Sequence, residues 1–219
     1  HAVSPAVPSE ATERTRRYAD RFDWDLKLID AREFSDADYL RNPVNRCFFC
    51  KSNLYRTISR YSRKNVVSGT NLDDLADYRP GLQAAALFHV SHPYVDAGID
   101  KALVREIAAA FELADIAELP ASPCLSSRLE TGIPVDAHTL DFVHAVETLI
   151  HSGLDAHTVR CRIRKDGPVI ELDETACERV MSDECSSLRR QIELLASVHG
   201  YSHIPRFERY RMGSAFLQS

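Results

Sequence analysis

Long apolar runs are missing from this 219-residue chain. No stretch reaches the roughly 18–20 apolar residues that cross a bilayer, and the first residues lack the basic-then-apolar pattern of a signal peptide. These absences predict a soluble, cytoplasmic protein without a membrane partner. In that reducing compartment, free or metal-bound thiols are favoured over disulfides. Internal repeats are also absent, and the length allows one large or two small domains with real cores.

Lysine is scarce, and histidine shows no metal-binding pattern. The 27 basic residues include five lysines, so 22 are arginines, whose planar forks bind carboxylates and phosphates, although a genome rich in G and C gives the same bias. The net charge of -5 argues against a long nucleic-acid footprint. The nine histidines contain no His-Glu-x-x-His pattern, so we expect them to be structural or surface residues.

Three of the six cysteines stand in patterns typical of a sulfur or metal site. Cys47 and Cys50 form a C-x-x-C at the start of a predicted helix, and Cys124 lies in a distant Pro-Cys-Leu-Ser-Ser-Arg turn. Three thiolates are one short of a closed zinc shell or an ordinary iron–sulfur cluster, which leaves one position open for chemistry. The helix N-terminus, Arg46 and Lys51 should favour the thiolate forms. A redox dithiol or half of a structural zinc site are the alternatives.

The pattern of predicted elements indicates two units, 1–129 and 130–219. In the first, helices alternate with short β-type runs at residues 24–29 and 65–69, which is typical of an α/β, doubly wound parallel sheet. Such a sheet binds ligands at the carboxyl ends of its strands. The second unit reads as a small α+β domain after a linker at 130–134. Helices are expected over residues 10–22, 47–62, 72–89 (broken near residue 80), 101–113, 137–150 and 186–198, and later strands over 158–163 and 169–172.

Two further segments carry candidate binding groups. After the β-type run that ends at Gly69, several carboxylates enter the next helix, where they would suit magnesium or a nucleotide; helix capping by Asn71 or Asp73 is the alternative. Along the strand predicted at 158–163, arginines alternate with apolar residues and so share one face. Because neighbouring guanidiniums repel one another, that face needs solvent or an anion, and a phosphate fits.

Five motifs in order over nearly the whole chain resemble one family. They are Ser-Pro-Ala-Val-Pro from Ser4, Asn-Arg-Cys-x-x-Cys-Lys from Asn45, Gly-Thr-Asn-x-Asp-Asp-x-x-Asp-Tyr-Arg-Pro-Gly-Leu from Gly69, Pro-Cys-Leu-Ser-Ser-Arg from Pro123 and Tyr-Arg-x-Gly-Ser from Tyr210. The chain is similar to the ATP-dependent sulfur transferase that builds the nickel-pincer cofactor of lactate racemase, a branch of the PP-loop ATP pyrophosphatases.

This resemblance implies a two-step reaction on a small molecule. A carboxylate of a pyridinium dicarboxylate mononucleotide is adenylated with ATP and Mg²⁺, which creates a leaving group, and is then replaced by a thiocarboxylate. In members with one cysteine, the residue matching Cys124 is the sulfur donor. In members with three, the thiols hold a [4Fe–4S] cluster whose open iron binds an extra sulfide. Because all three are present here, we expect the cluster version and, as in the family, a homo-oligomer, a hexamer.

The resemblance also assigns roles to single residues, residue by residue along the matching motifs. The implied cluster ligands are Cys47, Cys50 and Cys124, with Cys124 as the catalytic cysteine. The implied ligands on the ATP and magnesium side are Gly69, Thr70, Asn71, Asp74, Asp77 and Arg79. The implied substrate-phosphate ligands are Arg160, Arg162 and Arg211.

The chain departs from the family pattern at several places. The opening strand and Ser-Gly-Gly-x-Asp-Ser loop, whose amides cradle the ATP pyrophosphate, are not in the sequence as given. Either that loop precedes His1 in a longer protein, or this chain does not adenylate a carboxylate by itself. Leu87 also stands where a glutamate is usual. A tRNA thiolase of the same superfamily and a non-catalytic metal-binding or assembly subunit are therefore the competing hypotheses.

Overall fold

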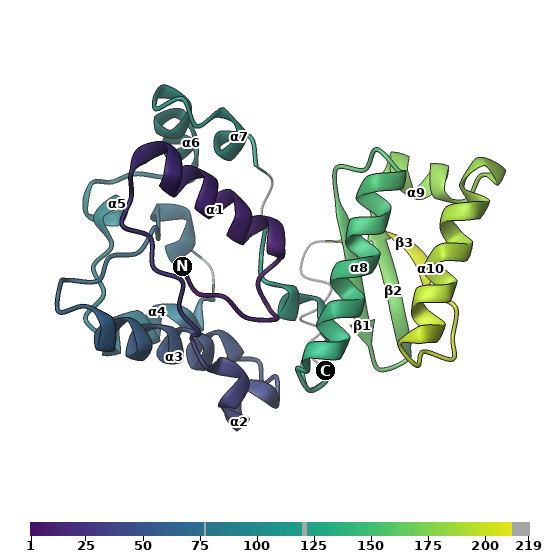
Figure 1. Ribbon diagram of the computed structural model, residues 1–219, viewed down its shortest axis with the longest axis horizontal. Helices are drawn as coiled ribbons and strands as arrows, with labels where there is room; N and C mark the ends of the chain where they lie inside the picture. The colour runs from purple at the N-terminus through teal and green to yellow at the C-terminus, as the bar shows by residue number, and fades with distance from the viewer. Residues whose placement is uncertain (77, 120–121, 212–219) are drawn as a thin grey trace.

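The protein mixes helices with one small sheet, as the computed structural model shows for residues 1–76, 78–119 and 122–211. Figure 1 shows a lobe that holds α1 to α7 beside a second lobe, in which α8, α9 and α10 accompany the three strands. The first lobe contains α1 (Ser9–Phe22), η1 (Glu33–Ser35), α2 (Ala37–Leu40), α3 (Arg46–Tyr61), η2 (Leu72–Leu75), α4 (Pro80–Leu87), α5 (Pro93–Asp96), α6 (Lys101–Ala110) and α7 (Ala114–Ala117).

The second lobe is built on the three-stranded sheet. It contains η3 (Leu125–Arg128), α8 (Ala137–Gly153), β1 (Val159–Arg164), β2 (Gly167–Leu172), α9 (Glu174–Val180), η4 (Asp183–Cys185), α10 (Ser186–Val198) and β3 (Arg206–Arg209). β1 and β2 form an antiparallel hairpin with Cys161 opposite Ile170, and β3 joins β2 in parallel. The hairpin turn needs Gly167, whose φ of 117° lies in a region that other residues rarely adopt.

The predicted mixture of helices and sheet is confirmed, but the doubly wound parallel sheet is not seen in the described ranges. Of the two β-type runs predicted in the first lobe, each forms one isolated parallel bridge, Ile29 to Ala2 and Val67 to Ser91. A bridge extends into a ladder only when both segments stay extended side by side. Here residues 24–28, which precede Ile29, form no strand. None of the described helices is long and apolar enough to cross a membrane.

The main hydrophobic core connects the two lobes. α8 contributes Phe142, Val143, Val146 and Ile150, all fully buried. Its apolar residues recur at helical spacing, and the Asp136 carboxylate caps its first turn by accepting from Thr139 N. The same core includes buried residues of the first lobe, such as Ala6 and Tyr39. The core therefore crosses residue 130, and the domain boundary placed there stays a prediction.

Candidate functional site

The C-x-x-C motif lies in the first turns of α3. Cys47 is exposed, and Cys50 is half-buried against the main core. The helix begins at Arg46, directly after Asn45, as the sequence predicted. Cys47 and Cys50 are three positions apart and so lie on neighbouring parts of one helix face. This end of α3 therefore presents two thiols beside each other.

The turn that carries Cys124 is held against the start of α3 by buried polar contacts. Arg46 Nη1 donates to the carbonyl of Ser126 at 2.8 Å and also bonds the side chain of Asn42. The hydroxyls of Tyr39 and Ser126 lie 2.7 Å apart. All four of these side chains are buried, so losing a partner would leave an unsatisfied group without water. The two distant cysteine motifs are thus joined by their flanking residues.

Arg128 fixes the same turn from the other side. Its Nη1 donates to the carbonyls of Pro123 at 2.8 Å and Cys124 at 3.3 Å. Its Nε and Nη2 each donate to a carboxylate oxygen of Glu147 on α8 at 2.9 Å. The Oε1 atom of Glu147 also accepts from the backbone N–H of Cys161 at 2.8 Å. The backbone around Cys124 is therefore positioned by a buried, bidentate ion pair.

Cys124 is close enough to Cys47 and Cys50 for its charge to affect the pKa of both. Burial, followed by the negative charge of Cys124, raises the pKa of Cys50 to about 12. Desolvation also raises the pKa of Cys47, although the residue as a whole is exposed, and Cys124 again adds to the effect. Burial is likewise the main cause that raises the pKa of Tyr39, with the charges of Cys124 and Cys50 contributing.

Two expectations about the thiols need qualification. The prediction that cations would favour the thiolates is wrong for Cys47 and Cys50, because desolvation outweighs the opposing charges of Arg46 and Lys51. Within the described residues, no three His, Cys, Asp or Glu side chains are arranged to hold a metal ion as they stand. Cys47, Cys50 and Cys124 could supply three thiolate ligands. As they stand, their side chains are not arranged around a common metal position.

A cavity of about 560 Å³ opens beside the Cys124 turn and next to α8. Ser122 and Leu125, which lie on either side of the Pro-Cys pair, contribute to its wall, as does Arg128. Arg160 also lines it, and burial, followed by the charge of Arg128, lowers the pKa of Arg160. The remaining lining residues are Pro8, Ser9, Glu10, Leu119, His144, Glu147, Thr148, His151, Ser152 and His157. The cavity therefore gathers Arg160 and three histidines beside the Arg128–Glu147 ion pair, with Glu10 as a second carboxylate in its wall.

Arg162, predicted to bind the substrate phosphate, forms an ion pair with a carboxylate of the chain itself. Its side chain is 6% exposed, and its Nε lies 3.0 Å from a carboxylate oxygen of Glu171, while Nη1 donates to Ser127 O at 2.9 Å. Arg164 pairs with the other oxygen of Glu171 at 2.8 Å and with Glu208 at 3.1 Å. The anion that this arginine face requires is therefore supplied by the chain itself. Only Arg160 of the predicted pair lines the cavity.

Arg211 lies just beyond β3 and is exposed. The backbone N–H of its neighbour Tyr210 donates to the carbonyl of Leu172 at 2.7 Å, which continues the pairing with β2. Tyr210 is also close enough to Arg160 for its charge to affect the pKa of that arginine. The end of the chain's described part therefore comes near Arg160, whereas the role of Arg211 as a phosphate ligand stays a prediction.

The segment that begins at Gly69 is largely engaged in its own fold. Asn71 caps η2 and forms a reciprocal capping box with Asp74, whose Oδ1 lies 2.9 Å from Arg79 Nη2. Asp73 accepts from the backbone of Lys101 at 2.8 Å. Capping, the simpler alternative, therefore accounts for these side chains.

The structure describes two of the other predicted ATP and magnesium ligands, Gly69 and Thr70, but not Asp77. Thr70 bonds the hydroxyl of Ser68 at 2.8 Å, nothing approaches the open side of Gly69, and Asp77 lies outside the described residues. The segment's end, at Gly81, packs on α3, where an added Cβ would lie 3.1 Å from Lys51 Cγ and 3.8 Å from Cys47 O. The segment therefore reaches the cysteine helix.

Sequence reasoning missed the residues that join the motifs, chiefly Tyr39 and Glu147. Glu147 left one readable signal, because it is a charged residue on the apolar stripe of α8, between Val143 and Ile150. A carboxylate in such a position is almost always paired. Its partner Arg128 is the last residue of the Pro-Cys-Leu-Ser-Ser-Arg motif, but nothing in the local sequence indicates that Glu147 and Arg128 pair.

Comparisons with known proteins place the chain among relatives from distant organisms. No protein-family model matches. The chain is 33% identical over 186 residues to the uncharacterized protein slr1717 of Synechocystis, covering 83% of this chain and 69% of that protein. It is 29% identical over 160 residues to the uncharacterized protein MJ0830 of Methanocaldococcus jannaschii, covering 71% of this chain and 60% of that protein. By this likeness the chain belongs to the same family as the Synechocystis protein slr1717.

Proposed function

We propose that the protein is an ATP-dependent sulfur transferase of the PP-loop superfamily, related to the enzyme that makes the nickel-pincer cofactor. The observation that carries the proposal is that the Cys124 turn packs against the start of α3, which carries Cys47 and Cys50, although the motifs lie far apart in the sequence. Buried contacts from Arg46 and Arg128 hold the turn in that place.

The donor set fits a [4Fe–4S] cluster bound by three thiolates. Thiolate is the ligand that such clusters require, and a fourth corner would stay open. Binding requires rotation of the three side chains toward a common centre and loss of the thiol protons, and burial raises the pKa of Cys47 and of Cys50 in the metal-free protein. When bound, the cluster would supply a sulfur atom for transfer. Lys51 and Arg46 would offset the negative charge of the thiolates.

The substrate in this proposal is a small phosphorylated carboxylate bound in the cavity beside the Cys124 turn. Arg160 would bind the phosphate, with Arg211 near it, whereas Arg162 would hold the strand through Glu171. In the transfer step, a hydrosulfide sulfur attacks the carbonyl carbon of the acyl adenylate. A C–S bond forms, the C–O bond to AMP breaks, and one proton is released, which gives a thiocarboxylate and AMP.

The proposal extends to a doubly wound PP-loop domain and to ATP and magnesium on the Gly69 side. The isolated parallel bridges at Ile29 and Val67 support it, because they are the pairings expected between neighbouring parallel strands. The packing of Gly81 on the cysteine helix also supports it, because a nucleotide beside that segment would lie next to the sulfur site.

A sulfur-transfer assay tests the function. The full-length protein, reconstituted with iron and sulfide, is incubated with ATP, Mg²⁺ and a pyridinium dicarboxylate mononucleotide, and the product is analysed by mass spectrometry. We expect a product in which one oxygen is replaced by sulfur, lost in Cys124→Ala and retained in the control Cys185→Ala. Absence of any thiocarboxylate, with AMP still formed, would refute the sulfur-transfer step.

A further inference from the structure

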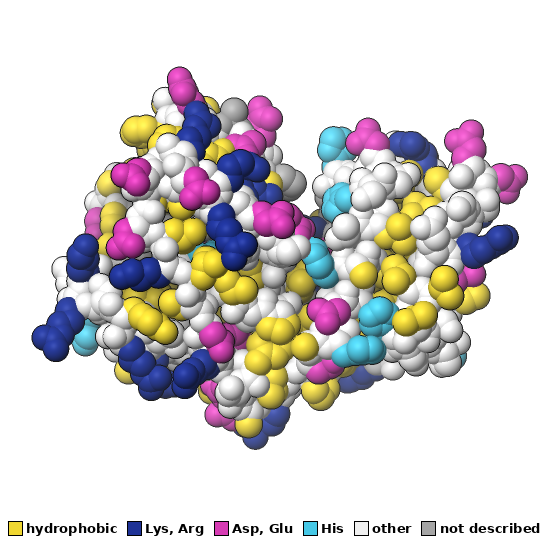
Figure 2. All heavy atoms as spheres, in the orientation of Figure 1, with side chains coloured by type: hydrophobic (Ala, Val, Ile, Leu, Met, Phe, Trp, Pro, Cys, Tyr) yellow, Lys and Arg dark blue, Asp and Glu magenta, His cyan; other side chains and the backbone are white. Residues whose placement is uncertain are grey.

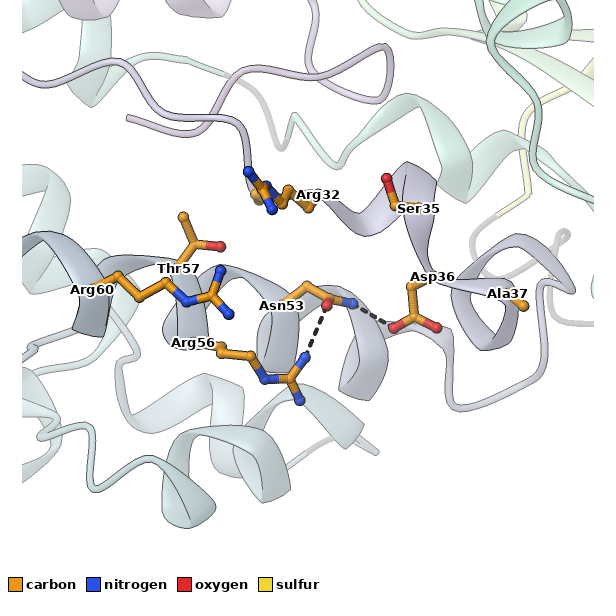
Figure 3. Close-up of a pocket in the computed structure, with 9 residues that line it drawn as sticks. Arg32, Ser35, Asp36, Ala37, Asn53, Arg56, Thr57 and Arg60 are labelled. Carbon is orange, nitrogen blue, oxygen red and sulfur yellow. Dashed lines mark hydrogen bonds between the residues drawn. The ribbon is translucent and has the colours of Figure 1, made fainter.

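A second pocket, of about 440 Å³, lies between α3 and the η1–α2 segment. Its wall is made by Arg32, Arg56 and Arg60 together with hydroxyl and amide groups (Figure 3). The other lining residues are Ala31, Ser35, Asp36, Ala37, Asn53 and Thr57. None of these residues lines the cavity beside Cys124 or belongs to the cysteine motifs. The pocket is therefore a separate feature of the first lobe.

Helical spacing explains how α3 supplies most of the pocket. Asn53, Arg56, Thr57 and Arg60 recur at intervals of three and four residues, so their side chains share one face of the helix. Figure 3 shows Arg56 and Arg60 projecting from this helix, with Arg32 on the opposite side of the pocket. Three guanidinium groups thus surround one opening from two separate segments of the chain.

These arginines have no acidic partner in the described part of the chain. No ion pair there includes Arg32, Arg56 or Arg60, although Arg56 Nη1 donates to Asn53 Oδ1 at 3.2 Å. The carboxylate in the wall, Asp36, is already used, because it caps α2 and accepts from Asn53. Like charges without a counter-ion repel one another, so an anion would be bound favourably here.

The conformation of Arg32 is a second, independent observation. Its φ of 62° lies in the left-handed region that favours glycine, yet an arginine occupies the position. The backbone N–H of Arg32 donates to Asp30 Oδ1 at 2.7 Å, which helps to hold this shape. The left-handed turn directs the long side chain to the pocket. Strained backbone that places a charged side chain at a pocket is typical of binding sites.

The surrounding surface has the same sign of charge. Figure 2 shows basic side chains gathered along the lower left of the molecule, over α3 as it is placed in Figure 1. The exposed basic residues of α3 and the segment after it are Lys51, Arg56, Arg60, Arg63 and Lys64. A local positive field of this kind attracts small anions to the pocket even though the whole chain carries a net charge of -5.

From these observations we infer that the pocket formed by Arg32, Arg56 and Arg60 is a binding site for a phosphate-bearing anion of about pyrophosphate size. The planar forks of the arginines would bind phosphate oxygens in pairs, and the Thr57 and Ser35 hydroxyls would donate to the remaining oxygens. The site does not depend on the sulfur-transfer proposal, because no residue is shared between them.

Calorimetric titration of the metal-free protein with inorganic pyrophosphate, in about 0.15 M salt, tests the inference. We expect one site per chain in the wild type and an affinity about tenfold or more lower in the double variant Arg56→Gln/Arg60→Gln. The matched control is Arg16→Gln/Arg190→Gln, which removes the same charge from exposed positions away from the pocket and should bind like the wild type. Circular dichroism shows whether each variant is folded.

Three outcomes would overturn the inference. They are no binding by the wild type, unchanged affinity in the pocket variant, and an equal loss in the pocket and control variants, which would indicate only a general charge effect. Should the double variant fail to fold, Arg32→Gly provides the decisive measurement, because glycine suits the left-handed backbone there while the guanidinium is removed. A pyrophosphate affinity unchanged in folded Arg32→Gly would equally contradict the site.

Discussion

Arg128 and Glu147 form a bidentate ion pair inside the protein, with both N–O distances at 2.9 Å. The pair joins the turn of Cys124 to the middle of α8, and both side chains are 10% exposed or less. A charge in such a position is costly without its partner. The sulfur site therefore depends on a contact that lies outside the cysteine motifs.

Glu147→Gln tests this dependence. The variant leaves the Arg128 charge buried without a counter-charge, so we expect the free energy of unfolding to fall by about 3–5 kcal/mol in urea titrations. The control is Glu178→Gln, which breaks an exposed pair with Arg209 and should change stability by less than about 1 kcal/mol. Equal effects of the two substitutions would show that the buried pair has no special role.

Arg160→Gln and Arg162→Gln should separate binding from stability. Arg162 is buried on Glu171, so its loss should lower the free energy of unfolding by about 3 kcal/mol or more. Arg160 lines the cavity, so its loss should weaken binding of nicotinic acid mononucleotide, a phosphorylated pyridinium carboxylate, by about tenfold. Urea titration and calorimetry measure the two effects. The reverse pattern would mean that Arg162 is the substrate ligand.

The pKa of Cys50 predicts how metal-free stability changes with pH. Burial, then the charges of Cys124 and Glu33, raises this pKa from 9.0 to about 12. Between those values the folded state holds the thiol proton more tightly than the unfolded state. Stability is therefore full below about pH 9 and falls as pH rises toward 12, by roughly 1 kcal/mol per pH unit. Urea titrations from about pH 8 to about pH 10 should show a steeper fall in the wild type than in Cys50→Ala. Identical slopes would mean that the thiol is not desolvated.

Arg32→Gly should raise thermal stability while it weakens pyrophosphate binding. An L-residue in the left-handed region costs about 1 kcal/mol, which glycine avoids, so we expect the Tm to rise by about 2–4 °C. Differential scanning calorimetry measures the rise. Asp23→Gly is the control, because Asp23 also has a positive φ, of 52°, but lies outside the pocket. A lower Tm for Arg32→Gly would show that the side chain stabilises the fold rather than a ligand.

The local pattern of the sequence was enough to predict most regular elements. Helical spacing located α1, α3, α8 and α10 to within a few residues, and the strands predicted at 158–163 and 169–172 correspond to β1 and β2. β3 was missed, because Arg-Phe-Glu-Arg has too few apolar residues to stand out as a strand. It is a strand because β2 offers it a pairing edge, which is tertiary information.

The sequence could not show which side chains pair with the predicted arginines and thiols. The arginine face of β1 was predicted from alternation, and its need for an anion follows from charge. That Glu171 and Glu208 supply the anion depends on the fold of β2 and β3, which no spacing in β1 reveals. The prediction that the thiolates would be favoured was wrong for a similar reason. Desolvation of Cys50 depends on how the core packs around it, which the local sequence does not show.

The central claim is that Cys47, Cys50 and Cys124 hold one inorganic centre together. Anaerobic reconstitution with iron and sulfide, followed by iron analysis and absorption spectroscopy, tests it most directly. We predict about four irons per chain with a shoulder near ~400 nm, retained in Cys185→Ala and lost in each single Ala variant of the three cysteines. Full iron content in Cys124→Ala, or a colourless wild type that binds zinc instead, would contradict the claim.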